Sequence, residues 1–78
     1  MKDIVISTEN IKLDSFLKLA GEAQSGGEAK KMINSKKVLV NGEICTSRGK
    51  KLVSGNSISV EKSDEKSMEK NEYRVVYE

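Results

Sequence analysis

The chain has 78 residues, of which 36% are hydrophobic and 33% charged, and its formal net charge is +2. A chain of this length can form only one domain, residues 1–78, with a marginal core. The single cysteine, Cys45, excludes an internal disulfide framework, and the sequence has no apolar run near the roughly 20 residues that span a bilayer. We therefore expect a cytoplasmic protein with no membrane partner.

Positive charge gathers in the middle of the chain. Between Gln24 and Lys51 there are seven basic and two acidic residues, whereas residues 61–78 contain four basic and six acidic ones. Such asymmetry is typical of a polyanion-binding face on the middle segment. A solvated lysine-rich surface gives the same pattern, so charge alone leaves both interpretations open.

The N-terminal part predicts a short strand over residues 3–7, which is rich in β-forming side chains. A helix follows, because Leu13, Phe16, Leu17 and Ala20 recur at helical spacing. Gly21 is a natural C-terminal stop for this helix.

A second helix is predicted to begin after Ser25 and to end near residue 35. Ser25 can cap its first turn while Glu28, three positions later, completes a capping box. Ala29, Met32 and Ile33 then form the buried face.

The next segment predicts a β-hairpin. Residues 38–40 and 43–45 form its strands, and Asn41-Gly42 suits a type I′ turn because both central positions need positive φ. A polar loop over residues 46–51, a turn over 54–56 and a strand over 58–60 follow.

Residues 61–72 are charged and predict a flexible connection. Residues 73–77 predict a C-terminal strand that pairs with the N-terminal one, since each would otherwise have an open edge. The helices are grouped rather than alternating with strands, which indicates an α+β fold.

An enzyme is disfavoured by the residue types present. The sequence has no histidine, so Cys45 lacks the usual activating base, and no Cys/His cluster could hold zinc. The acidic residues are scattered. We expect a non-catalytic protein with no cofactor and no small-molecule substrate.

Two groups of residues could bind phosphate. Gly26 and Gly27 leave backbone N–H groups open at a helix N-terminus, although they could instead permit close helix packing. Lys30 and Lys31 lie off the apolar face of that helix, and a second basic group surrounds Gly49. Neither group contains aromatic residues, which favours folded or double-stranded RNA over stacked single strands.

Several segments together resemble a known family. They are Lys12–Leu17, Ser25–Lys30, Val38–Glu43, Arg48–Leu52 and Gly55–Asn56. The combination is similar to the RNA-binding domain named after small-subunit ribosomal protein four, here called the S-four domain, in its small stand-alone bacterial form of the YaaA type. The resemblance covers residues 11–60, and the two end strands fit the smallest members.

The resemblance implies the alpha-L RNA-binding motif, in which two helices pack on a small, bent antiparallel sheet. It also implies RNA contact by the second helix and adjoining loops. The residues at the matching positions are Lys12, Ser25, Gly26, Gly27, Lys30, Lys31, Lys37, Asn41, Arg48, Lys50 and Lys51. Many members have Arg where Gly26 follows Ser25 here, so backbone rather than guanidinium would meet phosphate.

The sequence therefore predicts a non-catalytic protein that binds structured RNA, with ribosomal RNA or a ribosome-associated RNA as target and the ribosome or a subunit as partner. A protein-interaction adaptor on the ribosome is the main alternative. A DNA-binding accessory protein is the third, although no helix offers Arg, Asn or Gln suited to reading base edges.

Overall fold

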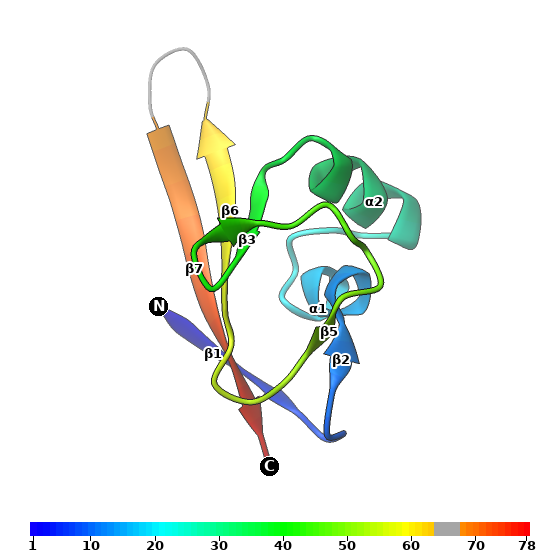
Figure 1. Cartoon of the computed structure of the whole chain (residues 1–78), viewed down its shortest axis with the longest axis vertical. Coiled ribbons are helices and arrows are strands. Elements are labelled where there is room, and N and C mark those ends of the chain that lie inside the picture. The colour runs from blue at the N-terminus through cyan, green and yellow to red at the C-terminus, as the bar shows by residue number, and fades with distance from the viewer. Residues whose placement is uncertain (64–67) are drawn as a thin grey trace.

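The computed structural model describes residues 1–63 and 68–78, and it places two helices on one side of a five-stranded sheet (Figure 1). The elements in chain order are β1 (Lys2–Ile6), β2 (Ile11–Lys12), α1 (Leu13–Leu19), α2 (Gly26–Asn34), β3 (Val38–Val40), β4 (Glu43–Ile44), β5 (Lys51–Leu52), β6 (Ser57–Ser63) and β7 (Met68–Tyr77). This arrangement confirms the predicted α+β class.

The five-stranded sheet has the order β1-β7-β6-β3-β4, and β2 and β5 form a separate two-stranded sheet. The predicted pairing of the terminal strands is confirmed, with Lys2 opposite Tyr73. The prediction of an antiparallel sheet is wrong at this edge, because β1 and β7 run parallel and the sheet is mixed. Two parallel neighbouring strands need a long connection between them, and here the chain between β1 and β7 forms that connection.

Both helices follow their sequence signals. α1 ends where Ala20 caps it and Gly21 adopts a φ of +82°. At α2 the Ser25 Oγ accepts a hydrogen bond from the Glu28 N–H at 3.2 Å, which is the predicted N-cap. Ala29 and Ile33 are fully buried, whereas Met32 is only partly buried.

The Asn41-Gly42 turn has the predicted conformation, with φ values of +52° and +85°. It joins β3 to β4 so that Val40 lies opposite Glu43. The Asn41 side chain adds a second role, because its Oδ1 accepts a hydrogen bond from the Ser57 N–H at 2.9 Å. The turn is thereby fixed to the start of β6.

The prediction of a flexible connection over 61–72 is wrong for the residues that the structure describes. Residues 61–63 continue β6 and residues 68–72 begin β7, and residues 64–67 lie outside the described residues. Composition misled the prediction because the charges are complementary across the hairpin. Glu61 lies opposite Lys70, and Lys62 lies opposite Glu69. Opposite charges at facing positions favour an antiparallel ladder. The two lysines themselves form ion pairs with Glu22 and Glu72.

One hydrophobic core joins the helices to the inner face of the sheet. Phe16 and Leu17 of α1, Ile33 of α2 and Ile58 of β6 are completely buried. Phe16 also meets Tyr73 of β7 edge to face, with ring centroids 6.2 Å apart. Neither helix in the described part of the chain has the length and apolar character needed to cross a membrane.

Candidate nucleic-acid interface

The small sheet formed by β2 and β5 brings two predicted site residues together. Ile11 pairs with Leu52, and Lys12 pairs directly with Lys51 in antiparallel register. Leu52 is completely buried, whereas Lys12 and Lys51 are both exposed. Burial of Leu52 therefore fixes the register that sets the two lysines side by side.

The loop before β5 is attached to the first turn of α1. The Leu13 N–H donates to the Lys50 carbonyl oxygen at 2.9 Å, and the Asp14 N–H donates to the Arg48 carbonyl oxygen at 3.2 Å. The side chain of the N-cap residue, Lys12, makes no capping hydrogen bond to this helix in the described structure. The loop carbonyls thus satisfy two N–H groups that a capping residue would otherwise serve. We call Lys12, Arg48, Lys50 and Lys51 the loop cluster.

The loop cluster carries four positive charges without acidic partners in the described structure. The ion pairs among the described residues join Lys62 to Glu22, Lys70 to Glu72 and Arg74 to Asp3. Like charges placed directly opposite on paired strands destabilise the pairing. A polyanion lying across Lys12 and Lys51 would remove that repulsion.

A second set, the helix cluster, consists of Ser25, Gly26, Gly27, Lys30 and Lys31. Lys30 and Lys31 are exposed on α2. A Cβ added at Gly26 would meet nothing within 4 Å, and one at Gly27 would meet only the Ser25 Oγ, at 3.9 Å. Close packing therefore does not explain these glycines, and they leave the start of α2 accessible.

The two remaining predicted residues, Lys37 and Asn41, lie between Lys31 and Arg48 in sequence. Lys37 is exposed, and its carbonyl oxygen accepts a hydrogen bond from the Glu61 N–H at 2.8 Å. Asn41 uses its Oδ1 to hold Ser57, as described above, so its amide nitrogen is the group left for a ligand. No hydrogen bond or ion pair between described residues links the helix cluster to the loop cluster.

One polar network was not predicted. The Glu22 Oε1 lies 2.8 Å from the Lys62 Nζ, and its Oε2 accepts from the Asn71 Nδ2 at 3.1 Å. The Glu22 side chain is only 3% exposed. Burial alone would raise the pKa of this carboxyl, but hydrogen bonds from Lys62, Asn71 and Tyr73 outweigh it and hold the pKa below its ordinary value. The partners are too distant in sequence to give any local signal.

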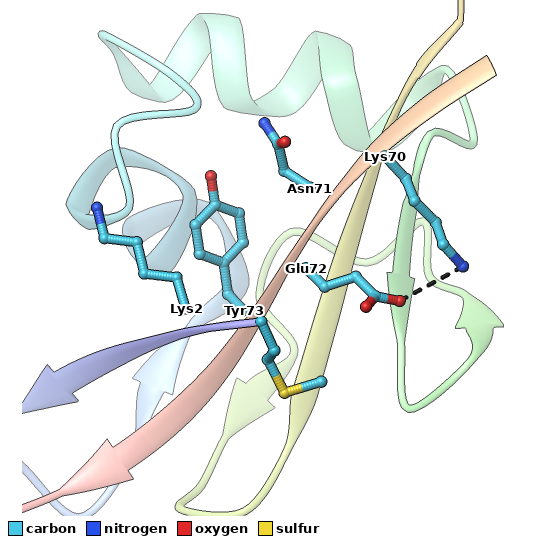
Figure 2. Close-up of a pocket in the computed structure, with 6 residues that line it drawn as sticks. Lys2, Lys70, Asn71, Glu72 and Tyr73 are labelled. Carbon is cyan, nitrogen blue, oxygen red and sulfur yellow. Dashed lines mark ion pairs between the residues drawn. The ribbon is translucent and has the colours of Figure 1, made fainter.

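A shallow hollow of about 490 Å³ lies where β1 begins beside β7 (Figure 2). Tyr73 and Asn71 point to one side of β7, and Lys70 and Glu72 point to the other. Lys70 is paired with Glu72 at 3.4 Å. Its charge is therefore partly neutralised, which makes Lys70 a weaker candidate for anion binding than the lysines of the loop cluster.

Comparison with known proteins agrees with this geometry. The family model described as the S4 domain matches residues 4–68. The chain is also 48% identical over 58 residues to the Bacillus subtilis (strain 168) protein named Probable ribosome maturation protein RlbA, an alignment that covers 74% of this chain and 82% of that protein. The match extends beyond residues 11–60 on both sides. This chain therefore belongs to the S4 domain family.

Proposed function

We propose that this protein is a non-catalytic RNA-binding protein that holds structured RNA, with ribosomal RNA as its target, through phosphate contacts. The observation that carries the proposal is the direct pairing of Lys12 with Lys51, two exposed lysines opposite each other with no acidic partner in the described structure. Membership of the S4 domain family and the name of the Bacillus subtilis relative support a ribosome-related target.

The loop cluster would contact the RNA backbone from a fixed position. The carbonyl oxygens of Arg48 and Lys50 accept hydrogen bonds from the first turn of α1. The backbone that carries these two side chains is therefore held in place before RNA binds. Preorganisation lowers the entropic cost of binding. The helix cluster would add Lys30, Lys31 and the backbone N–H groups at the start of α2. Glu28 in that first turn would repel phosphate, so Lys30 and Lys31 carry the main charge there.

The test is fluorescence anisotropy with a labelled ribosomal RNA hairpin and a DNA duplex of equal length, each measured across a salt series. We expect tighter binding to RNA, with log K falling against log salt at a slope of about −3 to −5 if four to six phosphates are contacted. Changing Lys30, Lys31, Lys50 and Lys51 to Glu should abolish RNA binding. Unchanged affinity in that variant would refute the proposal.

The ribosomal target needs a separate measurement. The protein should co-sediment with ribosomes or a ribosomal subunit, and nuclease treatment should release it. Retention after nuclease treatment would indicate that a protein on the ribosome is the partner instead.

A further inference from the structure

The carboxylate of Glu22 lies where it can hold α2 against the sheet. Glu22 belongs to the connection between the two helices, three residues before Ser25, the N-cap of α2. Its side chain is only 3% exposed, and all of its side-chain hydrogen-bond donors described above come from the β6–β7 hairpin. Neither Glu22 nor these donors belong to the loop cluster or the helix cluster, so the proposed phosphate contacts leave this network without a role.

The network joins the helix layer to two strands. The Glu22 Oε1 lies 2.8 Å from the Lys62 Nζ on β6, and its Oε2 accepts from the Asn71 Nδ2 on β7 at 3.1 Å. The Tyr73 side chain is the third partner. Figure 2 shows Asn71 and Tyr73 pointing to the same side of β7, and the Tyr73 ring there meets Phe16 of α1. The carboxylate is therefore held from two strands at once.

The same part of β6 also holds the chain after α2. β3 pairs with β6 only as far as Val60, whereas β6 and β7 stay paired up to Ser63. Lys62 therefore lies in a segment that extends past β3. Beside it, the Glu61 N–H donates to the carbonyl oxygen of Lys37, just beyond the end of α2, at 2.8 Å. Two consecutive residues of β6 thus hold the chain on both sides of α2.

α1 connects this network with the loop cluster. The first turn of α1 donates hydrogen bonds to the carbonyl oxygens of Arg48 and Lys50. Beyond its other end, the Glu22 N–H donates to the Leu17 carbonyl oxygen at 2.9 Å. The loop cluster and the Glu22 carboxylate are therefore attached to opposite ends of one helix. The contacts of that carboxylate with β6 and β7 then determine how the following helix, α2, lies relative to the loop cluster.

A buried charged network is a costly way to gain stability. The carboxylate loses its hydration, and this loss offsets much of what the ion pair contributes. What such a network supplies well is a defined position, because several donors of fixed direction permit one placement of the acceptor. Binding residues need support of this kind, since a basic side chain that is displaced from its phosphate contributes little. The geometry therefore favours a positioning role for Glu22.

We propose that Glu22 is a positioning residue for RNA binding, which fixes α2 so that Lys30 and Lys31 meet the same RNA molecule as the loop cluster. The inference rests on the proposed function and adds that the two clusters act as one surface. Without the Glu22 contacts α2 stays helical, because Ser25 caps it and Ile33 is buried in the core. Its lysines are then no longer held in register with the loop cluster.

Glu22→Gln gives a test whose sign separates positioning from long-range electrostatics. The change removes a negative charge, so electrostatic attraction alone predicts equal or tighter RNA binding. Loss of positioning predicts about three- to tenfold weaker binding to the labelled ribosomal RNA hairpin. The slope of log K against log salt should also fall in magnitude by about one to two, as Lys30 and Lys31 lose their phosphates. All variants are compared at a temperature at which their unfolding curves show them folded.

The matched control is Glu9→Gln, which makes the same substitution at an exposed side chain outside the network. It should bind the RNA hairpin at least as tightly as the wild type, with the same salt slope. Weaker binding in both variants would overturn the inference, because the effect would then not depend on the position of Glu22.

A double-mutant cycle identifies the cluster that is affected. In the wild type, changing Lys30 and Lys31 together to Gln should weaken RNA binding about tenfold. In the Glu22→Gln background the same two changes should cost less than about twofold, because these lysines have already lost their contacts. Changing Lys50 and Lys51 to Gln should cost as much in that background as in the wild type.

Tyr73→Phe tests the network without a change of charge, and it serves if Glu22→Gln does not fold. It removes one partner of Glu22 and keeps the ring that meets Phe16. RNA binding should weaken about two- to threefold, since one of several hydrogen bonds is lost. In ¹⁵N NMR spectra of the free variant, the amide signals of Gly26 and Gly27 should shift, while those of the loop cluster stay in place.

The outcomes separate the inference from the proposed function. Glu22→Gln affinity equal to or above that of the wild type would overturn the inference. Equal costs of the Lys30 and Lys31 changes in the two backgrounds would overturn it as well. Failure of the wild type to bind RNA would instead refute the proposed function itself.

Discussion

Lys12 and Lys51 lie directly opposite each other in the β2–β5 pair, and both are exposed to solvent. This placement costs stability when the protein is free and supplies two adjacent charges when a polyanion binds. The two consequences can be measured independently, because one concerns the free energy of unfolding and the other concerns RNA affinity.

Lys51→Glu should separate these effects. It replaces a like-charge pair by an opposite-charge pair, so the free energy of unfolding should rise by about 0.2–1 kcal/mol. RNA affinity should fall, and the slope of log K against log salt should decrease in magnitude by about one. Urea unfolding and anisotropy titrations check the two parts.

The control for Lys51→Glu is Lys2→Glu, which makes the same charge change on β1, outside the two-stranded sheet that carries Lys12 and Lys51. It should leave the salt slope close to that of the wild type. A variant Lys51→Glu that is less stable than the wild type would contradict the proposed repulsion between Lys12 and Lys51.

Glu22→Gln should make the free energy of unfolding less sensitive to a fall in pH. The pKa of the Glu22 carboxyl lies below its ordinary value of 4.5 in the folded protein. Its charged form therefore contributes stability above that value, and the contribution is lost as pH falls through the lower, folded pKa. Urea unfolding should show a larger difference between wild type and variant at about pH 7 than at about pH 3.

The partner residue gives a matched comparison. Lys62→Gln leaves the nearly buried Glu22 carboxylate without its cation, whereas Arg74→Gln breaks an exposed pair whose side chains are 52% and 51% exposed. The first change should lower the free energy of unfolding by more than 1 kcal/mol, and the second by less than about 0.5 kcal/mol. Equal losses of unfolding free energy in the two variants would show that burial of Glu22 does not raise the cost of removing its partner.

Lys36→Gly should stabilise the protein. Lys36 follows the C-terminal cap of α2 with a φ of +61°, in the left-handed region where a side chain costs about 1–2 kcal/mol. Glycine removes this strain but gains freedom in the unfolded chain, so we expect a net gain of about 0.5–1 kcal/mol. Lys37→Gly, at a position without positive φ, should have no such benefit. Thermal unfolding of the two variants side by side provides the measurement.

Asn41→Ala should destabilise the fold for two reasons. It removes the acceptor for the Ser57 N–H, and it places a side chain with no local hydrogen bond at a φ of +52°. A loss of about 1–2 kcal/mol is expected. Asn41→Gly keeps the backbone freedom and loses only the acceptor, so it should cost less. A larger loss in Asn41→Gly would mean that backbone strain is not part of the effect.

Local sequence patterns predicted the helices and the tight hairpin well. Ser25 caps α2 as expected, and the Asn41-Gly42 turn has the expected positive φ values, because these features depend on residues within a few positions of one another. The parallel pairing of β1 with β7 depends on residues from opposite ends of the chain, and local periodicity carries no information about strand direction.

The candidate site was likewise predictable only in part. The basic residues are visible in the sequence, but their grouping is not. The pairing of Lys12 with Lys51 depends on β2, a two-residue strand that gives no periodic signal. The long β6–β7 hairpin was missed for a different reason. Its charged residues lie at complementary cross-strand positions, and Lys62 and Lys70 form ion pairs with Glu22 and Glu72, features that composition alone does not distinguish from disorder.

The position of β7 between β1 and β6 has a consequence for how the protein is made. During synthesis β1 is made before every other element of the described fold, yet its neighbour in the sheet is β7, the last of these elements. Ile4 and Ile6 of β1 are buried in the hydrophobic core of the folded protein. The nascent chain thus leaves β1 without its sheet partner until residues 68–77 have been synthesised, so this part of the sheet forms late in folding.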